Sequence, residues 1–459
     1  MLANWHQFRL VECMMRNNLI QKRWLAVISV TQIFLLLLLV QIVAAKSFEV
    51  TQAQQQDTLP PPFHTQSTKN FSKVVGWRPG ETPVAPAGFT VNKYAEGLEH
   101  PRWIYVADNG DVFVAESNTV LKGLLKLGSK ISRKIKTHHY GESANRITML
   151  RDKNNDGVAD SSYVFAENLN QPFGMLILNK NFYVANTDGL VRFDYNLGNT
   201  KLAGTGSSVV GLPAGKPNQH WTRNIIANNK GDKIYIAVGS ATNMADKGLE
   251  KEIRRANILE INTDGTGEKI YASGLRNPVG MDWAPGTGVL WTAVNERDLL
   301  GEDLVPDYLV GVKEGGFYGW PFSYFGQHAD PRMKEQQRPD LVSKTIEPDL
   351  SLGPHTASLG LKFYDKAAFP EKYKNGAFIT QHGSWNRKNL SGYKVVFVPF
   401  ANGKPTGKVE DFLTGFLVPG STDSEVRGRP VGIALLEDGS MLISDDVNGI
   451  IWRIAAEKK

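Results

Sequence analysis

The stretches Pro172-Phe173-Gly174-Met175, Pro278-Val279-Gly280-Met281 and Pro430-Val431-Gly432-Ile433 repeat one short theme, in which a proline and an apolar residue precede a glycine and a second apolar residue. After a turn, each copy continues into alternating apolar residues, in Phe182-Tyr183-Val184-Ala185, Val289-Leu290-Trp291-Thr292 and Met441-Leu442-Ile443-Ser444. Alternation with a period of two, broken by turn residues, is typical of antiparallel β-hairpins. The theme therefore predicts paired strands at widely separated places in the chain.

Pairs of short strands around Asn-, Asp- or Gly-rich turns recur six times along the chain. They fall in residues 101–116, 172–194, 224–239, 278–295, 359–383 and 430–454. Repetition at this spacing predicts an all-β fold, a six-bladed β-propeller with long insertions. No long amphipathic helical pattern follows residue 46, which disfavours α/β folds. In a propeller, loops at one end of the central channel carry the functional groups, so we expect the residues beside each repeat to form one site.

The composition indicates a globular protein. The chain has 459 residues, of which 41% are hydrophobic and 21% charged, and a net charge of +6. Residues 1–45 hold four of the basic residues and one of the acidic residues, which leaves +3 for the rest. Since no basic run occurs elsewhere, we expect no nucleic-acid partner.

The first 84 residues differ in composition from the rest. Lys22-Arg23 precede a mostly apolar stretch over residues 25–45 that ends in Val43-Ala44-Ala45. This pattern predicts that residues 1–45 are a cleaved export signal or an uncleaved membrane anchor, with Met14 or Met15 as an alternative start. Either way, basic residues on the near side predict a periplasmic or other extracytoplasmic domain, free or tethered to the inner membrane. The one cysteine, Cys13, lies before the apolar stretch, so cysteine chemistry is excluded from the exported part.

Residues 46–84 are rich in Gln, Thr, Pro and Ser, which predicts a disordered, flexible linker. The propeller domain is then expected over residues 85–459.

Cationic residues and histidines stand beside the repeats. They are Arg276 with Asn277, Arg427 and Arg429, His382 in residues 381–387, and His220 in residues 217–224. Arginine binds carboxylates bidentately and stacks on rings, so the set predicts a flat ligand with several negative charges. A histidine can accept a proton from an alcohol. Each of these residues also has a purely structural interpretation. His220 could be a loop histidine hydrogen-bonded to backbone, Arg276 a surface turn residue, and Arg427 and Arg429 solvated charges at a strand edge.

Two loops are rich in oxygen ligands, and two tryptophans lie near them. Residues 295–308 include Asn295, Glu296 and Asp303. The second loop has the calcium-type spacing Asp152, Asn154, Asp156 and Asp160, with Gly157 at the sixth position. Both suit calcium, although a solvated acidic loop and an Asn/Asp-rich hairpin turn remain alternatives. Trp320 and Trp385 could wall a sugar or ring pocket, or pack between blades.

Taken together, these motifs resemble the glucose/sorbosone dehydrogenase family of quinoprotein sugar dehydrogenases, in particular its sorbosone and pyranose dehydrogenase branch. The resemblance covers roughly residues 85–456. It is carried by residues 295–298 with 301–308, 315–321, 382–387 and 428–432. It implies a six-bladed propeller that binds pyrroloquinoline quinone (PQQ) together with calcium.

The resemblance also implies roles for individual residues. His220 matches the general base, and Arg276 with Asn277 matches the pair that holds PQQ and polarises its carbonyl. Gln171 matches a glutamine near cofactor and substrate, and Arg427 and Arg429 match the arginines on the PQQ carboxylates.

The chain departs from the family pattern at several positions. His382 stands where glucose-oxidising members have a lysine, and Gln219 where they have an acidic residue. The cofactor calcium is expected at the loop that contains Asn295, Glu296 and Asp303, and the substrate pocket at Gln171, Trp320 and Trp385.

The sequence thus predicts an oxidoreductase, a PQQ-dependent dehydrogenase that oxidises a sorbosone-like or pyranose sugar and passes electrons to a quinone or cytochrome. Two alternatives stay open, a non-catalytic propeller that binds a ligand or partner and a calcium-dependent hydrolase of the lactonase type.

Overall fold

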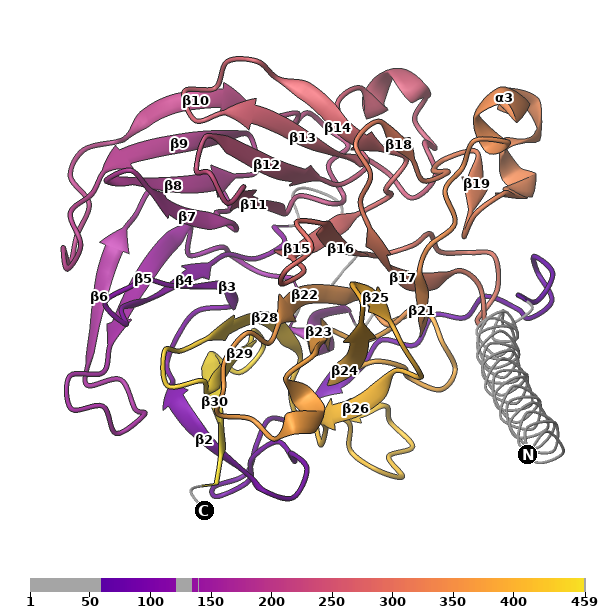
Figure 1. The fold of residues 1–459 in the computed structure, drawn as a ribbon. Coiled ribbons are helices and arrows are strands. Elements are labelled where there is room, and N and C mark those ends of the chain that lie inside the picture. Colours follow the sequence, from indigo (N-terminus) through magenta and orange to yellow (C-terminus); the bar gives the residue numbers. More distant parts are fainter. Residues whose placement is uncertain (1–58, 121–133, 139, 458–459) are drawn as a thin grey trace, which may run out of the picture. The chain divides into compact units, whose positions relative to one another are not determined.

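The repeated theme leads into the innermost strands of three blades. In the computed structural model, which describes residues 59–120, 134–138 and 140–457, these strands are β7 (Met175–Leu178), β15 (Pro278–Trp283) and β28 (Pro430–Leu435). The corresponding strands of the other blades are β3 (Pro101–Val106), β11 (Arg223–Ala227) and β22 (Ser358–Phe363). Figure 1 shows the six strands around the middle of the molecule, with β6, β10 and β2 at its edge. The prediction of an all-β, six-bladed propeller is confirmed.

Each blade is a mostly antiparallel sheet whose strands follow one another outward. Blade 1 continues through β4 (Val112–Glu116), β5 (Arg146–Arg151) and β6 (Ser161–Ala166), and blade 2 through β8 (Asn181–Asn186), β9 (Gly189–Asp194) and β10 (Ser207–Gly211). Blade 3 continues through β12 (Lys233–Val238), β13 (Asn257–Asn262) and β14 (Lys269–Ser273), and blade 4 through β16 (Leu290–Val294), β17 (Pro306–Gly311) and β21 (Leu350–Pro354). Blade 5 continues through β23 (Gly376–Gln381), β24 (Lys394–Ala401), β25 (Lys404–Pro405) and β26 (Glu410–Leu413), and blade 6 through β29 (Met441–Asp445) and β30 (Ile450–Ala456).

The remaining elements are short. Two small sheets pair β1 (Lys73–Val74) with β27 (Glu425–Val426) and β19 (Ser323–Tyr324) with β20 (His328–Ala329), and β18 (Gly316–Phe317) adds to blade 3 beside β14. The helices are η1 (Lys134–Thr137), η2 (Leu249–Glu252), η3 (Pro331–Gln336), α3 (Pro339–Val342) and η4 (Glu371–Tyr373). No helix in the described part of the chain has the length and apolar character needed to cross a membrane.

The glycine of the theme allows neighbouring innermost strands to approach each other. A Cβ added at Gly174 would lie 2.6 Å from the Ile225 nitrogen on β11, and one at Gly280 would lie 2.5 Å from the Leu361 nitrogen on β22. Gly360 meets β28 and Gly432 meets β3 in the same way. A side chain at these positions would push the ring of strands apart, which gives a physical reason for the repeated glycine.

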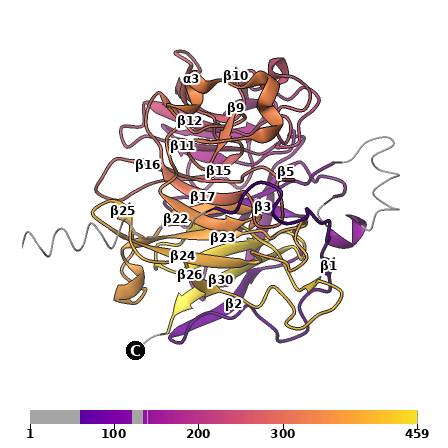
Figure 2. The ribbon, with the colours of Figure 1, turned by 90° about the vertical axis from the view of Figure 1, so that its right-hand side faces the viewer.

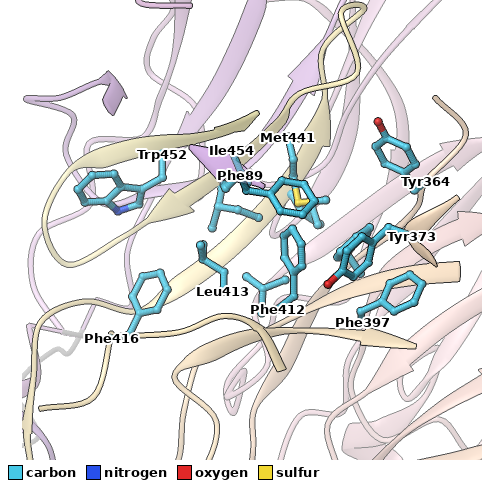
Figure 3. Close-up of a cluster of buried hydrophobic side chains, with 14 of the residues drawn as sticks. Phe89, Tyr364, Tyr373, Phe397, Phe412, Leu413, Phe416, Met441, Trp452 and Ile454 are labelled. Carbon is cyan, nitrogen blue, oxygen red and sulfur yellow. The ribbon is translucent and has the colours of Figure 1, made fainter. Parts of the chain in front are cut away.

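A separate hydrophobic cluster fills each space between neighbouring blades. On β12, Ile234 and Ile236 pack toward blade 2, whereas Tyr235 and Ala237 pack toward blade 4. Successive strand residues point to opposite faces, so a blade that is covered on both faces needs apolar residues at nearly every position. Figure 3 shows the aromatic cluster between blades 5 and 6, to which Phe89, Phe412 and Trp452 contribute.

Blade 6 is completed by a strand from the opposite end of the domain. β2 (Phe89–Ala95) pairs antiparallel with β30, and Figure 1 shows the two side by side. The ring is thus closed by main-chain hydrogen bonds between the first and last propeller strands, which leaves no open gap between blades.

Residues 60–84 run along the propeller, and we call them the N-terminal strap. β1 within the strap pairs with β27, Phe63 N donates to Leu300 O at 2.7 Å, and Trp77 packs edge-on against Phe416 and Trp452. The predicted flexible linker over residues 46–84 is therefore wrong for residues 60–84, because their backbone and aromatic groups find partners on the propeller. The predicted export signal or anchor over residues 1–45, Cys13 and most of the remaining linker lie outside the described residues.

Candidate active site

A polar side chain stands just before the innermost strand of every blade. His220 precedes β11, Arg276 and Asn277 precede β15, Gln171 precedes β7, and Arg429 precedes β28, as the sequence predicted. His100 before β3 and His355 before β22 occupy the same phase, although sequence reasoning missed them. Because the innermost strands contact one another in order around the ring, these groups lie at one end of the channel. Counting residues back from each innermost strand would have found both histidines.

His220 has one ring nitrogen bonded and the other available. Its Nδ1 lies 2.9 Å from both the backbone oxygen and the hydroxyl of Ser240. Since a carbonyl oxygen can only accept, Nδ1 carries the proton, and the lone pair is on Nε2. Nε2 has no hydrogen-bond partner among the described residues. Burial and the charge of Arg276 lower the pKa of His220 to about 3, so the imidazole is neutral.

Asn277 lies against His220 because the residue between them has no side chain. A Cβ at Gly239 would meet both the Asn277 side-chain oxygen and, at 2.6 Å, the His220 Cβ. The Asn277 Oδ1 is buried and has no hydrogen-bond partner in the described structure. A buried, unpaired acceptor is unfavourable and indicates that a donor from elsewhere completes this position.

Arg276 is buried and held by fixed acceptors. Its Nε donates to Asn243 O at 3.1 Å, and its Nη2 donates to Asn243 Oδ1 at 2.9 Å and lies 3.3 Å from Asp298 Oδ2. Burial lowers the pKa of Arg276, and the charge of Asp298 opposes that shift. The guanidinium is thus a positive charge of fixed position beside His220.

Asp298 is the centre of a buried polar network that the sequence did not reveal. Its Oδ1 accepts from Asn386 Nδ2 at 2.7 Å and lies 3.5 Å from His355 Nδ1. The His355 Nε2 in turn lies 2.9 Å from Gly301 O. Burial raises the pKa of Asp298, but the hydrogen bond from His355 and the charge of Arg276 outweigh it and lower the pKa overall. Asp298 therefore stays ionised and fixes Arg276.

Arg429 is a buried arginine without an acidic partner. Its side chain is packed against Tyr393, with the guanidinium carbon 5.4 Å from the ring centre, and it donates to His382 O and Gly383 O at 3.0 Å each. The residue is 5% exposed, and its guanidinium forms no ion pair with a carboxylate among the described residues. Burying a charge without an ion-pair partner is costly, so this position favours an anion from outside the chain.

His382 contacts Asp446 instead of standing free. Its Nε2 is 2.9 Å from Asp446 Oδ2, and Asp446 also forms an ion pair with Arg102. Burial and the charge of Arg429 lower the pKa of His382 to about 4. The His382 carbonyl holds Arg429, and the predicted cofactor contact of the His382 side chain stays a prediction.

Arg427 does not join Arg429. It donates through Nε to Glu81 of the strap at 3.2 Å, and its Nη1 lies 3.4 Å from Gly415 O and Leu417 O. The chain bends at Arg427, so its side chain contacts the strap and not the surroundings of Arg429. The role on the PQQ carboxylates that the resemblance implies for Arg427 stays a prediction.

Tyr140 lies near residues on opposite sides of the site. Burial raises its pKa, and the charges of Arg429 in blade 6 and Asp298 in blade 4 both act on it. The backbone around it pairs with Thr119, whose hydroxyl accepts from Trp221 Nε1 at 2.8 Å. Tyr140 thus lies beside Thr119 in the segment between β4 and β5.

The predicted pocket residues are brought to the same end. Gln171 donates through Nε2 to Asn118 O at 2.8 Å and is half-buried. Trp320 is buried, and its Nε1 lies 3.1 Å from Asn243 O, the acceptor of Arg276. Trp385 is half-buried and stacks on Phe71 of the strap, with ring centres 5.7 Å apart. Trp320 therefore supports Arg276, and Trp385 has one face covered.

The predicted cofactor-calcium side chains are not gathered. Glu296 is buried in an ion pair with Arg297 at 2.9 Å, and Asp303 pairs with Arg387 at 2.9 Å. Asn295 donates through its amide to Ser358 O. Within the described residues, no three His, Cys, Asp or Glu side chains lie close enough together to hold a metal ion. The other carboxylates of this loop, those of Asp298, Glu302 and Asp307, accept hydrogen bonds within the protein.

The loop at residues 152–160 forms the turn between β5 and β6. Asp152 Oδ2 accepts from Gly157 N at 2.8 Å, Asn154 Oδ1 from Asp156 N at 3.0 Å, and Asp160 Oδ2 from Lys153 N at 2.6 Å. These bonds are those of an Asn/Asp-rich hairpin turn, the alternative noted above. A structural calcium at Asp152, Asn154, Asp156 and Asp160 stays a prediction.

The comparison with known protein families is decisive. The family model described as TrAA12-like matches residues 83–306 and 326–457, which is most of the chain. The chain belongs to the TrAA12-like family. The matched spans include every candidate residue above except Trp320, which lies with the 315–321 motif in the unmatched segment.

Two relatives show the reach of the sequence similarity. An uncharacterized protein of Borreliella burgdorferi is 28% identical over 389 residues, which is 81% of this chain and 90% of that protein. The pyrroloquinoline quinone-dependent pyranose dehydrogenase of Coprinopsis cinerea is 32% identical over 127 residues, which is 24% of this chain and 17% of the relative.

Solved structures share the fold. The holo form of the pyranose dehydrogenase PQQ domain from Coprinopsis cinerea gives a TM-score of 0.65 at 20% identity and covers 84% of this chain and 100% of its own. A calcium structure of a Trichoderma reesei carbohydrate-active enzyme of family AA12 gives 0.65 at 19% identity, covering 84% and 99%. The resemblance to quinoprotein sugar dehydrogenases, inferred from the sequence, is confirmed at the level of the family.

Proposed function

We propose that this protein is a PQQ-dependent dehydrogenase that oxidises a sugar or aldose. The observation that carries the proposal is Arg429, a buried arginine that lacks a carboxylate partner and faces the same end of the channel as Arg276 and His220. The relatives named above, a PQQ-dependent pyranose dehydrogenase among them, support the same reading.

The residues of the site fit a planar ligand with several carboxylates. Arg429 offers a cation without an acid, which suits a carboxylate, and Asn277 offers a buried amide oxygen that can accept from an N–H or O–H group of the ligand. Their positions are fixed, since Arg429 is held by two carbonyl oxygens and Asn277 by the close approach at Gly239. A preorganised cation binds a carboxylate with little further loss of entropy.

The chain's own residues supply the proton chemistry. When bound, PQQ would serve as the two-electron oxidant that receives hydride from the sugar. His220, neutral and with its Nε2 lone pair available, takes the proton of the sugar hydroxyl. Arg276 places a positive charge beside this base, where it stabilises negative charge that develops on a bound ligand. Ser240 holds the imidazole in the required tautomer, and bound anions near Arg276 would raise the His220 pKa.

The further parts of the proposal are an electron acceptor, calcium and a location. We include a quinone or cytochrome as acceptor because no nicotinamide-binding glycine motif follows a strand in the sequence. Calcium is included at the loop that contains Asn295, Glu296 and Asp303, and one structural neighbour of the same fold is a calcium structure. Export to an extracytoplasmic space, free or membrane-tethered, follows from the composition of residues 1–45.

The test is a titration of the full-length protein with PQQ, once with calcium and once with a chelator. Binding is followed by cofactor absorbance and by tryptophan fluorescence, and turnover by sugar-dependent reduction of an artificial acceptor dye over a panel of aldoses and sorbosone. We expect saturable binding and dye reduction with at least one sugar, both weakened by the chelator. Absence of PQQ binding at micromolar cofactor with calcium present would overturn the proposal and favour a propeller that binds another anion.

A further inference from the structure

The N-terminal strap is bonded to the loop that follows β16. Gly301 N donates to Ser67 Oγ at 3.2 Å, and Glu302 N donates to Thr65 Oγ1 at 2.8 Å. A Cβ added at Gly301 would lie 2.9 Å from the Thr65 hydroxyl, so the two segments are in close contact. Two side-chain hydroxyls of the strap thus satisfy backbone donors of a loop that also contains Asp298.

The strap also contacts the loop that follows β23. Asn70 N donates to Trp385 O at 2.7 Å, and Asn70 Nδ2 donates to Lys388 O at 2.9 Å. The ring of Phe71 is stacked on Trp385 with an interplanar angle of 8°. This loop contains Asn386, which donates to Asp298. The strap therefore holds both loops that fix Asp298.

A continuous series of polar contacts joins the strap to Arg276. Ser67 accepts from the Gly301 nitrogen, and the Gly301 oxygen lies 2.9 Å from His355 Nε2. His355 is 3.5 Å from Asp298, and Asp298 is 3.3 Å from Arg276. His355 and Arg276 are buried. If the loop at Gly301 moved, water could not replace the hydrogen bonds that these side chains would lose.

The other end of the strap contacts Asp445, the acidic residue that also accepts from the backbone nitrogen of Arg429. Trp77 Nε1 donates to Asp445 Oδ2 at 2.8 Å, and Asp445 Oδ1 accepts from the backbone nitrogen of Arg429 at 2.9 Å. Between these ends, β1 contacts η1, and Figure 2 shows β1 on the same side of the molecule as the short helix that precedes Tyr140. The strap thus passes along three segments that carry site residues.

We propose that the N-terminal strap is a working part of the site: Thr65 and Ser67 are positioning residues for Arg276, and Phe71 determines how Trp385 meets the substrate. The inference rests on the proposed function for its kinetic consequences, but its structural premise can be tested without it. The strap would thus contribute to ligand affinity, although residues 46–84, to which it belongs, have the composition of a linker.

The test uses the full-length protein and two variants, Phe71→Ala and the double variant Thr65→Val with Ser67→Ala. Phe71→Ala should raise KM for the sugar about fivefold while kcat stays within about twofold, because one aromatic contact is lost beside the substrate. The double variant should weaken PQQ affinity, measured by fluorescence titration, about three- to tenfold, because two hydrogen bonds that position Arg276 are lost.

The matched control is Lys73→Ala, which removes a half-exposed ion pair to Glu425 in the same strap, away from the loops. It should leave KM and PQQ affinity within about twofold of the unmodified protein. If the two strap variants lower the melting temperature but leave KM and affinity like those of the control, the strap is only structural and the inference fails.

Hydrogen exchange of the ligand-free protein separates this inference from the proposed function. The backbone amides of Gly301 and Glu302 should exchange at least about fivefold faster in the double variant than in Lys73→Ala, because they lose their hydroxyl acceptors. The amides of residues 384–388 should exchange faster in Phe71→Ala than in Lys73→Ala, because the loop loses the ring stacked on Trp385. Unchanged exchange overturns the strap inference, even if PQQ binds. Faster exchange in a protein that binds no PQQ would sustain the coupling of strap and loops and reject only the cofactor.

Discussion

The site has two halves that use the same residue types in opposite ways. In the half built by blades 3 and 4, Arg276 has an acidic partner, Asp298. His220 has no acidic partner, and its Nε2 has no hydrogen-bond partner among the described residues. In the half built by blades 5 and 6, His382 is bound to an acid, Asp446, whereas Arg429 has none. The unpaired group is thus a base in the first half and a cation in the second.

This difference separates the two tasks of the proposed enzyme. A base has to change its protonation during a reaction, so it needs an available lone pair more than a strong partner. A cation that anchors a carboxylate needs the opposite, a fixed charge without a competing acid. Arg276, His382 and Arg429 are buried and His220 is half-buried, and low-dielectric surroundings increase the cost of the wrong partner.

The largest effect is expected from the unpaired base. Replacing His220 by Ala should lower kcat by about two to four decades while PQQ still binds, because the proton acceptor is lost and the cationic groups remain. His382→Gln, in the other half, should lower kcat by less than about tenfold. The measurement is steady-state dye reduction with saturating sugar; equal losses in both variants would remove the distinction between the halves.

The unpaired cation is expected to have the next largest effect. Arg429→Gln should weaken PQQ affinity about 30- to 100-fold, because a charge-assisted bond to a buried carboxylate is worth about 2–3 kcal/mol. Arg427→Gln should change affinity by no more than about threefold, since Arg427 pairs with the strap. Titration of both variants with PQQ measures the two affinities. A similar loss of affinity in both would support the role on the PQQ carboxylates that the resemblance implies for both arginines.

A smaller effect is expected at the paired acid of the first half. Asp298→Asn keeps the shape of the side chain but removes the charge that holds Arg276. We expect kcat to fall about tenfold, with the thermal midpoint lowered by a few degrees. Glu314→Gln, which breaks an exposed ion pair with Lys269 outside the site, is the control and should leave both values nearly unchanged. A normal kcat in Asp298→Asn would show that Arg276 keeps its position without Asp298.

A pH dependence of stability is expected from both halves. Burial lowers the pKa of His220 to about 3 and of His382 to about 4, whereas unfolded histidine titrates near 6.5. The unfolded state therefore binds more protons below pH 6.5, and stability should decrease as pH falls from 6.5 to 4, by at most about 1.4 kcal/mol per pH unit for each histidine. Denaturant unfolding between pH 4 and 8 measures this slope, which should become shallower in His220→Gln.

Part of this arrangement could be predicted from the sequence. The Pro-x-Gly theme located three innermost strands because Gly174, Gly280 and Gly432 let each of them approach a neighbouring strand closely. The histidine and arginines before such strands lie at the channel end, as the repeat phase predicted. The position of Arg427, apart from Arg429, could not be predicted, because the sequence does not show that the chain bends at Arg427. Glu296 was taken for a metal ligand because sequence does not show that its neighbour Arg297 turns inward and pairs with it.

The network around Asp298 and the role of the strap could not be predicted for a different reason. Both depend on contacts between segments far apart in the chain, such as Ser67 with Gly301 and Asn386 with Asp298. The composition of residues 60–84 indicates low hydrophobicity, but backbone donors and acceptors on the propeller, not the hydrophobicity of the strap, determine where it binds.

The closure of blade 6 has a consequence for biosynthesis. β2 is among the first propeller strands to leave the ribosome, while β28, β29 and β30 are among the last, so the β2 edge waits unpaired until translation is nearly finished. Unpaired strand edges invite aggregation, which makes the unfinished chain a natural client of chaperones. Arg429 is made with those last strands. A chain whose translation stops before β28 therefore lacks both the strands that close the ring with β2 and Arg429. Binding of the anionic ligand would then distinguish complete chains from truncated ones.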